Sequence, residues 1–477
     1  RMTDGTMSRK GQYAILLVAA LAMFMDGLDG SIVNVALPVI SEDFGGDAGA
    51  ASWIVTVYLM VLAGLILIFG KISDSGALKR VFTIGFMVFA FSSLACGLST
   101  GLEMLLISRA AQGVGAAMLA AAAPMLCIKH GSPANLGFCL AVIWLGASVG
   151  AAMGPAVGGI LTQLASWHWI FLINVPIGLV AAVLALRIIP PDKGFVKASF
   201  DVAGSALLFA MLASGLYLVE SIPSSGVTGI TVPAALMFVA CLVLFVARER
   251  RCAAPVLNLG LFKHGNFVAV LTTYMLLNAC YMGAVYLVPF YFRIGMGFDT
   301  FTTGIYLLIP ALIPLLISAQ LSRLSDRTGR RTFAIIACAM SALFTAIYSV
   351  VTPGMGAVPL IIALAAMGLV WGIGGGSVSS RIVENAPRDD RGSASSLMSF
   401  ITYFGSALGT ALFAGLFGVG SGLRGVDASQ MPLADFLDGF HIAMIVGLVL
   451  SLIALALAAW VNEKKHGRIS ETGAARP

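Results

Sequence analysis

The chain has 477 residues, of which 59% are apolar and only 10% are charged, and its formal net charge is +6. Soluble domains carry about 25% charged residues, so this composition excludes a soluble protein and indicates an integral membrane protein. The apolar runs are long and do not alternate with polar residues, which excludes a transmembrane β-barrel.

Apolar runs long enough to cross a bilayer recur along the whole chain. A spanning helix needs about 20 predominantly apolar residues, and fourteen runs meet this criterion. The sequence therefore predicts an all-α integral membrane protein with fourteen transmembrane helices. In chain order the predicted helices cover residues 13–40, 51–71, 81–99, 102–127, 137–162, 169–189, 202–220, 230–247, 266–292, 302–321, 332–351, 356–378, 393–418 and 438–461.

The first predicted helix carries two carboxylates in the middle of its apolar run. Asp26 and Asp29 are three residues apart, so they lie on one helix face, and Gly27 and Gly30 keep the neighbouring surface thin. An acid at bilayer depth costs at least about 2.5 kcal/mol on insertion scales, so it is a functional candidate by default. Burial and mutual repulsion let one of the pair hold a proton near neutral pH. The plainer alternative is a hydrogen bond to a neighbouring helix.

The fourth predicted helix contains Arg109, a permanent cation in an apolar segment. Such a cation needs a partner or water, and Asp26 or Asp29 is the candidate partner. We interpret these three residues as a proton-coupling site, with a static structural ion pair as the alternative. We expect Asp29, near the bilayer midplane, to border a water-accessible cavity and to bind proton and cargo in competition. We therefore expect Asp29→Asn to abolish proton coupling while the protein still folds.

Small residues are concentrated in the fifth predicted helix. Their backbone can be approached closely by another helix, and a proline among them can kink the helix. Packing alone would also explain this pattern. The residues are Gly150, Gly154, Pro155, Gly158 and Gly159.

Two related turns suggest that the chain contains a repeat. GKISDSGALKR follows the second predicted helix, and SRLSDRTGRR follows the tenth. Each has an acid followed by basic residues, which could form gating ion pairs or could serve topology alone. The candidate gating residues are Gly70, Asp74, Lys79 and Arg80 in the first turn, and Asp326, Arg327, Gly329, Arg330 and Arg331 in the second.

If the seventh and eighth helices are an insertion, each half carries its turn between its own second and third helices. Parallel six-helix halves characterise one large transporter architecture. The expected organisation is a tail at 1–12, a six-helix half at 13–200, two additional helices at 201–250, a linker at 251–265, a second six-helix half at 266–461 and a tail at 462–477.

The distribution of basic residues predicts the orientation. Lys and Arg flank the cytoplasmic ends of membrane helices. With the N-terminus inside, the cytoplasmic segments hold 25 of the 28 Lys and Arg, and the outer segments hold only Arg293 and Arg424. We therefore expect a multi-pass protein of the cell membrane with both termini cytoplasmic. Because topology explains the basic charge, that charge gives no support to a nucleic-acid partner.

Four segments carry a resemblance to a known family. LDGSIVNVALP (28–38), SRAAQGVGAA (108–117), GAAMGPAVGG (150–159) and WHWIFLINVPIG (167–178) resemble motifs of the major facilitator superfamily, and within it the fourteen-helix drug:proton antiporters. In this resemblance Asp29 falls on the acidic position of the first-helix motif, Arg109 lies in the motif linked to proton transfer, and 150–159 is the antiporter motif. Asp26 lies outside the motif. The first turn departs from the family pattern, because Ser75 follows Asp74 and Gly76 comes early.

The ninth predicted helix offers polar and aromatic side chains for a cargo. Aromatic faces suit lipophilic cations, although an aromatic belt or ordinary core would give the same pattern. The candidate substrate-binding residues are Tyr274, Asn278 and Tyr281, together with Asp29 and Asn34 of the first helix.

The leading functional hypothesis is a proton-coupled exporter of lipophilic, cationic small molecules that works by alternating access. The alternative is a transporter of another cargo, such as a metabolite, peptide or lipid, because a fold does not determine its cargo. Five scattered histidines supply no catalytic or metal cluster, so no enzyme, cofactor or metal is expected. The expected partners are a small-molecule substrate, protons and the lipid bilayer.

Overall fold

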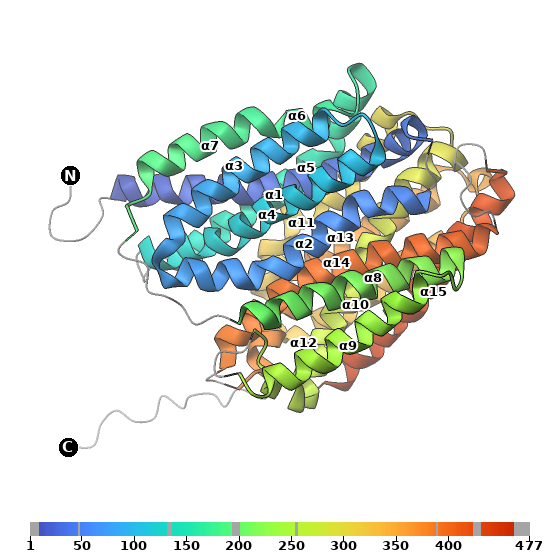
Figure 1. Cartoon of the computed structure of the whole chain (residues 1–477). Coiled ribbons are helices and arrows are strands. Elements are labelled where there is room, and N and C mark those ends of the chain that lie inside the picture. The colour runs from blue at the N-terminus through green and yellow to red at the C-terminus, as the bar shows by residue number, and fades with distance from the viewer. Residues whose placement is uncertain are drawn as a thin grey trace.

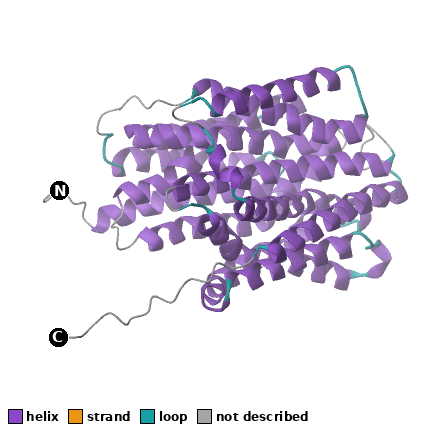
Figure 2. Ribbon diagram, turned by 90° about the horizontal axis from the view of Figure 1, so that it is seen from below, coloured by secondary structure: helices purple, strands orange, loops and turns teal. Residues whose placement is uncertain are grey.

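The computed structural model describes residues 9–45, 48–130, 136–192, 201–252, 256–387, 390–422 and 431–461. Within these ranges every regular element is a helix, and the helices run side by side as one bundle (Figures 1 and 2). The first group is α1 (Arg9–Asp43), α2 (Ala48–Ile72), η1 (Ser73–Ala77), α3 (Leu78–Gly97), α4 (Leu102–His130), α5 (Leu136–Leu164), α6 (Trp169–Leu172) and α7 (Asn174–Ile188).

The remaining helices are α8 (Val202–Ser225) and α9 (Thr231–Glu249), followed by η3 (Leu259–Lys263), α10 (Gly265–Phe290), η4 (Tyr291–Gly295), α11 (Thr300–Thr328), α12 (Arg330–Tyr348), η5 (Pro353–Met355), α13 (Ala357–Asn385), α14 (Arg391–Ser421) and α15 (Leu433–Trp460). We call α1–α7 the N-terminal group and α10–α15 the C-terminal group.

The predicted number of membrane crossings is confirmed. Thirteen helical stretches in the described residues are long and apolar enough to span a membrane, and one of them, Ala50–Gly97, contains both α2 and α3. These two helices meet at η1, where Gly76 has a positive φ of 104° and breaks the helical path. Counted separately, they give fourteen crossings, the sixth being α6 together with α7.

The two groups meet along two seams. Within the N-terminal group α1 packs on α5 and α4 packs between α2 and α3, while in the C-terminal group α10 packs on α14 and α13 lies against α11 and α12. Across the groups α5 packs on α11, and α2 packs on α14. α1 and α10 also contact each other, so part of each helix borders the space between the groups.

The helices α8 and α9 form a hairpin outside one seam. α8 packs on α14 and α2, whereas α9 packs chiefly on α8 (Figure 1). The Phe209 ring covers Gly64 of α2, where a Cβ would lie 2.7 Å from the ring. Many side chains of α9 are exposed, as expected of a helix that faces lipid. The start of α1 and the end of α15 lie at the same end of the bundle (Figure 1).

Candidate functional site

Asp29 and Arg109 form a buried ion pair between α1 and α4. Arg109 Nη1 lies 2.6 Å from Asp29 Oδ2, and the two side chains are only 1% and 0% exposed. Asp29 is therefore the partner of Arg109, a choice that the sequence left open between two carboxylates. Removing one member of a buried pair leaves an uncompensated charge and typically costs about 3–5 kcal/mol.

Neighbouring polar side chains hold this pair in a fixed geometry. Gln112, one turn along α4, accepts a hydrogen bond from Arg109 Nη1 at 2.6 Å and donates one to Asp29 Oδ1 at 2.8 Å. Asn174 at the start of α7 donates to the same carboxylate oxygen at 3.2 Å. Arg109 Nε donates to the Ile54 carbonyl of α2 at 3.0 Å. The ion pair thus joins α1, α2, α4 and α7, all within the N-terminal group.

Asp26 has a different environment, although it lies one turn away on α1. Its side chain is half-buried, and it accepts hydrogen bonds from Tyr58 Oη of α2 at 2.9 Å and from Tyr403 Oη of α14 at 3.1 Å. These two donors come from opposite groups of helices. Within the described ranges, no cation pairs with Asp26. Asp26 therefore links the two groups through neutral donors.

The arrangement corrects our expectation about access. Asp29, which we expected to border a water-accessible cavity, is fully buried inside the N-terminal group. Asp26 borders the seam instead, and no described atom lies within 4 Å of the position that a Cβ would take on Gly30, one turn further along α1. Gly27 allows a close approach of α5, as predicted, because a Cβ at this position would overlap the Ala147 carbonyl. Gly30 has no such neighbour.

Tyr58 connects the two carboxylates. Its hydroxyl binds Asp26, and its ring centre lies 4.1 Å from the guanidinium carbon of Arg109. This is cation–π geometry, which contributes more when the cation is desolvated, as it is here. A change at Asp26 can therefore reach Asp29 through two buried side chains, Tyr58 and Arg109.

The small residues of α5 form its contact with α1, as the sequence predicts. A Cβ on Gly150 would meet the Phe24 carbonyl, one on Gly154 would meet the Ser31 side chain, and one on Gly158 would lie 2.9 Å from Ile32. The contacts advance in the same direction along both helices, so α1 and α5 run parallel.

Gly159 faces the other group. A Cβ there would lie 2.9 Å from the Thr300 carbonyl of α11, and the Pro155 carbonyl lies against Gly304. The motif at 150–159 therefore serves two contacts: one within the N-terminal group and one across a seam.

Gly150→Ala should destabilise the protein. A methyl group there overlaps the backbone of α1, and overpacking of this kind typically costs about 1–3 kcal/mol. Gly70→Ala is the matched control, because no described atom lies within 4 Å of its Cβ position and alanine favours a helix over glycine by about 1 kcal/mol. Thermal unfolding of both variants in detergent checks this. Equal stability of the two variants would contradict the packing assignment.

Two of the predicted substrate-binding residues converge on one tryptophan. The rings of Tyr274 and Tyr281 lie 5.6 Å and 6.1 Å from that of Trp371 on α13, both edge to face. The Tyr274 hydroxyl also lies 3.1 Å from Thr402 Oγ1 of α14. An aromatic cluster of Tyr274, Tyr281 and Trp371 therefore forms in the C-terminal group.

The two predicted asparagines turn back onto their own helices. Asn34 Nδ2 donates to the Gly30 carbonyl at 2.7 Å, and Asn278 Nδ2 donates to the Tyr274 carbonyl at 2.9 Å. The side chains are 2% and 4% exposed. Asn34 Oδ1 is buried and has no hydrogen-bond partner among the described residues, so it keeps one acceptor that is not used locally.

The first predicted gating turn makes contacts within the N-terminal group. Lys79 Nζ donates to the carbonyls of Leu186 and Ile189 at the end of α7, at 2.7 and 2.6 Å. The backbone N–H groups of Lys79 and Arg80 donate to Asp192. Asp74 is exposed. Its backbone carbonyl accepts a hydrogen bond from Lys129 Nζ of α4 at 3.3 Å. Gly70 lies in the last turns of α2, with open space beside it.

The second turn behaves in the same way within the C-terminal group. Arg330 pairs with Glu384 of α13, and Arg331 donates to the Ala459 carbonyl of α15. Gly329 has a positive φ of 117°, and Gly76 in the first turn has 104°. Gly76, the glycine that comes early in the first turn, thus occupies the position at which the backbone has a positive φ. Arg327 is exposed, and the side chain of Asp326 lies outside the described residues.

An ion pair joins the two groups at the end of α1 and at η4, the short helix that follows α10. Arg293 Nε and Nη2 donate to the two oxygens of Glu42 at 2.7 and 2.8 Å. The side chains are 33% and 31% exposed. The contact of Gly159 with Thr300 lies at the same end, so the groups are held together there.

The sequence did not point to several residues of this site. Tyr58 and Tyr403 bind Asp26, Ser93 accepts from Gln112 Nε2 at 2.7 Å, and Trp371 completes the aromatic cluster. Asn174 lies inside the segment WHWIFLINVPIG, where a buried amide among apolar residues was the available signal. The tyrosines carried no comparable signal.

The fold consists of two groups of membrane helices that meet along two seams, with Asp26 bound from both groups. The chain belongs to the Major Facilitator Superfamily, whose family model matches residues 19–410. It is thus a multi-pass membrane transporter and not an enzyme, as the sequence indicated.

The names of the relatives that the chain resembles refer to more than one kind of cargo. The chain is 29% identical over 413 residues to the riboflavin transporter RibZ of Clostridioides difficile (strain 630), covering 86% of this chain and 89% of that protein. It is 26% identical over 458 residues to the multidrug resistance protein MdtD of Escherichia fergusonii, whose name marks the assignment as provisional, covering 94% of each.

Solved structures share the fold. A bacterial homolog of the human lysosomal transporter Spinster, solved in an inward-facing and unoccupied conformation, has a TM-score of 0.67 at 13% identity and covers 95% of this chain and 97% of that one. The nucleoside transporter NupG has a TM-score of 0.65 at 13% identity, covering 94% and 98%.

Proposed function

We propose that this transporter exports lipophilic, cationic small molecules in exchange for protons, by alternating access. The observation that carries the proposal is Asp26, a half-buried carboxylate held by one tyrosine from each group of helices. An antiporter needs one site where proton and cargo compete, and that site must sense the relative position of the two groups.

The chemistry of Asp26 meets both needs. When ionised, it attracts a cationic cargo and accepts charge-assisted hydrogen bonds, which are roughly twice as strong as neutral ones. When protonated, it loses that attraction, and its tie to Tyr403 weakens. Proton binding would thus release the cargo and loosen α14 from α1 in one step. Asp26 takes the role that we assigned to Asp29 from the sequence.

Asp29 and Arg109 then act as a charged support beside Asp26. The pair fixes the position of Tyr58, whose ring lies against Arg109 and whose hydroxyl binds Asp26. We propose that a change in the charge of Asp26 is felt by this pair through Tyr58. All three residues remain in the proton-coupling site, with Asp26 at its accessible end.

The aromatic cluster supports an apolar, flat or cationic cargo. Tyr and Trp faces attract cations by about 0.5–2 kcal/mol, and the cluster lies on helices that pack close to α14, which carries Tyr403. The likeness to a riboflavin transporter favours a second candidate, a neutral planar metabolite, since aromatic faces also stack on such rings.

One experiment tests the proposed function. The protein is reconstituted into vesicles, a pH gradient is imposed, and proton flux is recorded on adding cations, anions and neutral planar compounds. We expect lipophilic cations, and not the anions or neutral compounds, to cause protons to move in the direction opposite to the cargo. Flux without proton movement would overturn the coupling, and flux of a neutral planar compound alone would favour the second candidate.

We propose that the structure represents a state closed at the outer end. The Glu42–Arg293 ion pair and the contact of Gly159 with Thr300 support this, as do the turn contacts at the other end, which stay within their own groups. We also keep the division of the chain into six helices, two additional helices and six helices as part of this proposal.

Glu42→Gln should shift the protein toward a state open at the outer end. Partly exposed ion pairs contribute up to about 1 kcal/mol, which is about a fivefold change in the ratio of two conformations. Distances between spin labels on the outer ends of α1 and α11 would show it. Reversing the pair (Glu42→Arg with Arg293→Glu) should restore the original ratio, and an unchanged ratio in Glu42→Gln would contradict a clamp.

We propose that both termini are cytoplasmic, on the distribution of Lys and Arg. Single cysteines placed at 41–50 and 221–229 should react with an impermeant reagent added outside cells. Cysteines at 128–136 and 388–392 should react only after the membrane is opened. Labelling of both sets of cysteines from the same side of the membrane would contradict this topology.

A further inference from the structure

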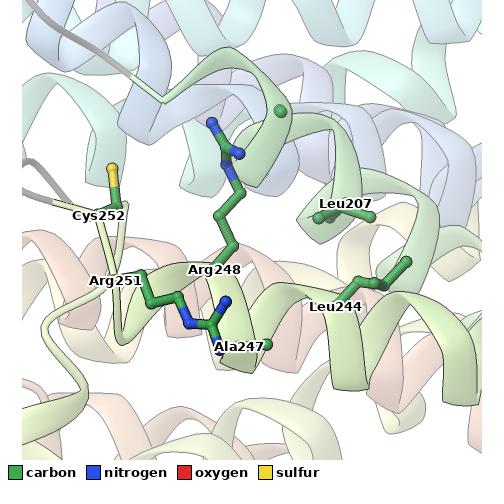
Figure 3. A pocket seen from close by; sticks show the side chains of 7 residues that line it. Leu207, Leu244, Ala247, Arg248, Arg251 and Cys252 are labelled. Carbon is green, nitrogen blue, oxygen red and sulfur yellow. The ribbon is translucent and has the colours of Figure 1, made fainter.

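The hairpin of α8 and α9 carries a pocket at the end of the bundle where α8 begins and α9 ends. The pocket encloses about 520 Å³, and its lining comprises Ala203, Leu207, Leu244, Ala247, Arg248, Arg251 and Cys252 (Figure 3). This volume falls within the range of about 300–1,000 Å³ typical of ligand sites. None of these residues belongs to the transport site.

The walls of the pocket continue into the surface that faces lipid. Leu244 is 55% exposed, and Leu236, Val239 and Val243 on the same helix are more than half exposed. On a membrane-spanning helix such side chains contact acyl chains. The pocket therefore opens both toward the acyl region, on its apolar side, and toward the headgroup region, where the two helices end.

Of the two arginines that line the pocket, Arg248 is paired with a carboxylate. Arg248 Nε binds both carboxylate oxygens of Asp201, the residue that caps α8, at 2.6 and 2.7 Å. Burial alone would raise the pKa of the Asp201 carboxyl, but the Gly204 N–H and the Arg248 guanidinium hold its pKa below the usual value. Arg248 is thus neutralised by an ionised partner. Its side chain is nevertheless 46% exposed.

Arg251 is the available cation. Within the described ranges no carboxylate pairs with it, and Figure 3 shows its side chain extending along α9 toward Ala247. Two guanidinium groups thus border an apolar pocket at headgroup level. The second carboxylate nearby, Glu249, is buried beside Asp201 and accepts hydrogen bonds from the backbone N–H groups of Val256 and Leu257, so it does not neutralise Arg251. Basic pockets between helices at the membrane surface suit the phosphate of an anionic lipid.

We propose that this pocket binds an anionic phospholipid, with the phosphodiester at Arg251 and Arg248 and an acyl chain along Leu207 and Leu244. Guanidinium groups match phosphate oxygens in geometry and charge. The bound lipid would fill the gap between the ends of α8 and α9 and fasten the hairpin to the membrane surface. This inference does not depend on the cargo or on proton coupling.

The test uses the full-length protein in detergent, titrated with phosphatidylglycerol and followed by native mass spectrometry. Arg251→Gln should weaken binding about tenfold, because it removes a charged hydrogen-bond donor to the phosphate. Arg250→Gln is the matched control, because Arg250 is exposed, adjacent and outside the pocket. Ala247→Trp should also weaken binding by filling the pocket without changing the charge.

Three outcomes would overturn the proposal. Equal loss in Arg251→Gln and Arg250→Gln would mean that only surface charge attracts the lipid. Equal affinity for phosphatidylcholine, which has the same phosphodiester but no net charge, would mean that the site does not select an anionic lipid. Displacement of the lipid by millimolar inorganic phosphate would indicate a site for the free ion.

Discussion

Asp26→Asn is expected to abolish transport driven by a proton gradient while the protein stays folded. The amide is isosteric with the carboxylate: its oxygen can accept from one tyrosine hydroxyl, and its NH2 group can donate to the oxygen of the other, so the loss of stability should be about 1 kcal/mol or less. It cannot bind and release a proton. In vesicles, uptake of a lipophilic cation against its gradient should fall to the level of empty vesicles.

Exchange of cargo for cargo provides the control for this variant. Such exchange needs the movement of the two groups but no proton, so Asp26→Asn should retain it, with weaker cargo binding and no dependence on pH. A variant that still accumulates cargo in response to a pH gradient would exclude Asp26 as the coupling site. Asp29 would then be the next candidate.

Tyr403→Phe separates the two roles of Asp26. This variant keeps the carboxylate and removes the donor from α14, so coupling should persist while the balance between conformations changes.

Asp29→Asn is expected to act mainly on folding, which differs from what the sequence led us to expect. Loss of the carboxylate leaves the Arg109 guanidinium buried without a countercharge, at a cost of about 3–5 kcal/mol. A large fraction of the stability of a typical protein would be lost. Thermal unfolding and the yield of folded protein should show the effect, and Asp26→Asn serves as an isosteric control one turn away on the same helix.

The double variant Asp29→Asn with Arg109→Gln tests what the ion pair contributes beyond stability. It removes both charges, so most of the folding defect should disappear. If the pair takes part in coupling, transport should remain impaired after stability returns. Recovery of gradient-driven transport would identify the pair as a static support.

Local patterns in the sequence were enough to predict the architecture. Each crossing needs only a sufficiently long apolar run, because the bilayer imposes the same length on every helix. The turns at Gly76 and Gly329 also depend on local chemistry, since each has the positive φ that glycine accommodates. The small-residue pattern of α5 likewise predicted close contact with another helix, although not which one.

The sequence by itself determined that Asp26, Asp29 and Arg109 lie at bilayer depth and need partners or water, because hydrocarbon does not solvate charge. Only the tertiary structure decided which partners they take. Arg109 meets Asp29 across 80 residues of sequence, and Asp26 meets Tyr403 across 377. A carboxylate three residues further along a helix points about 60° away. That rotation, set by how α1 packs on α5, places Asp29 inside one group and Asp26 between the two.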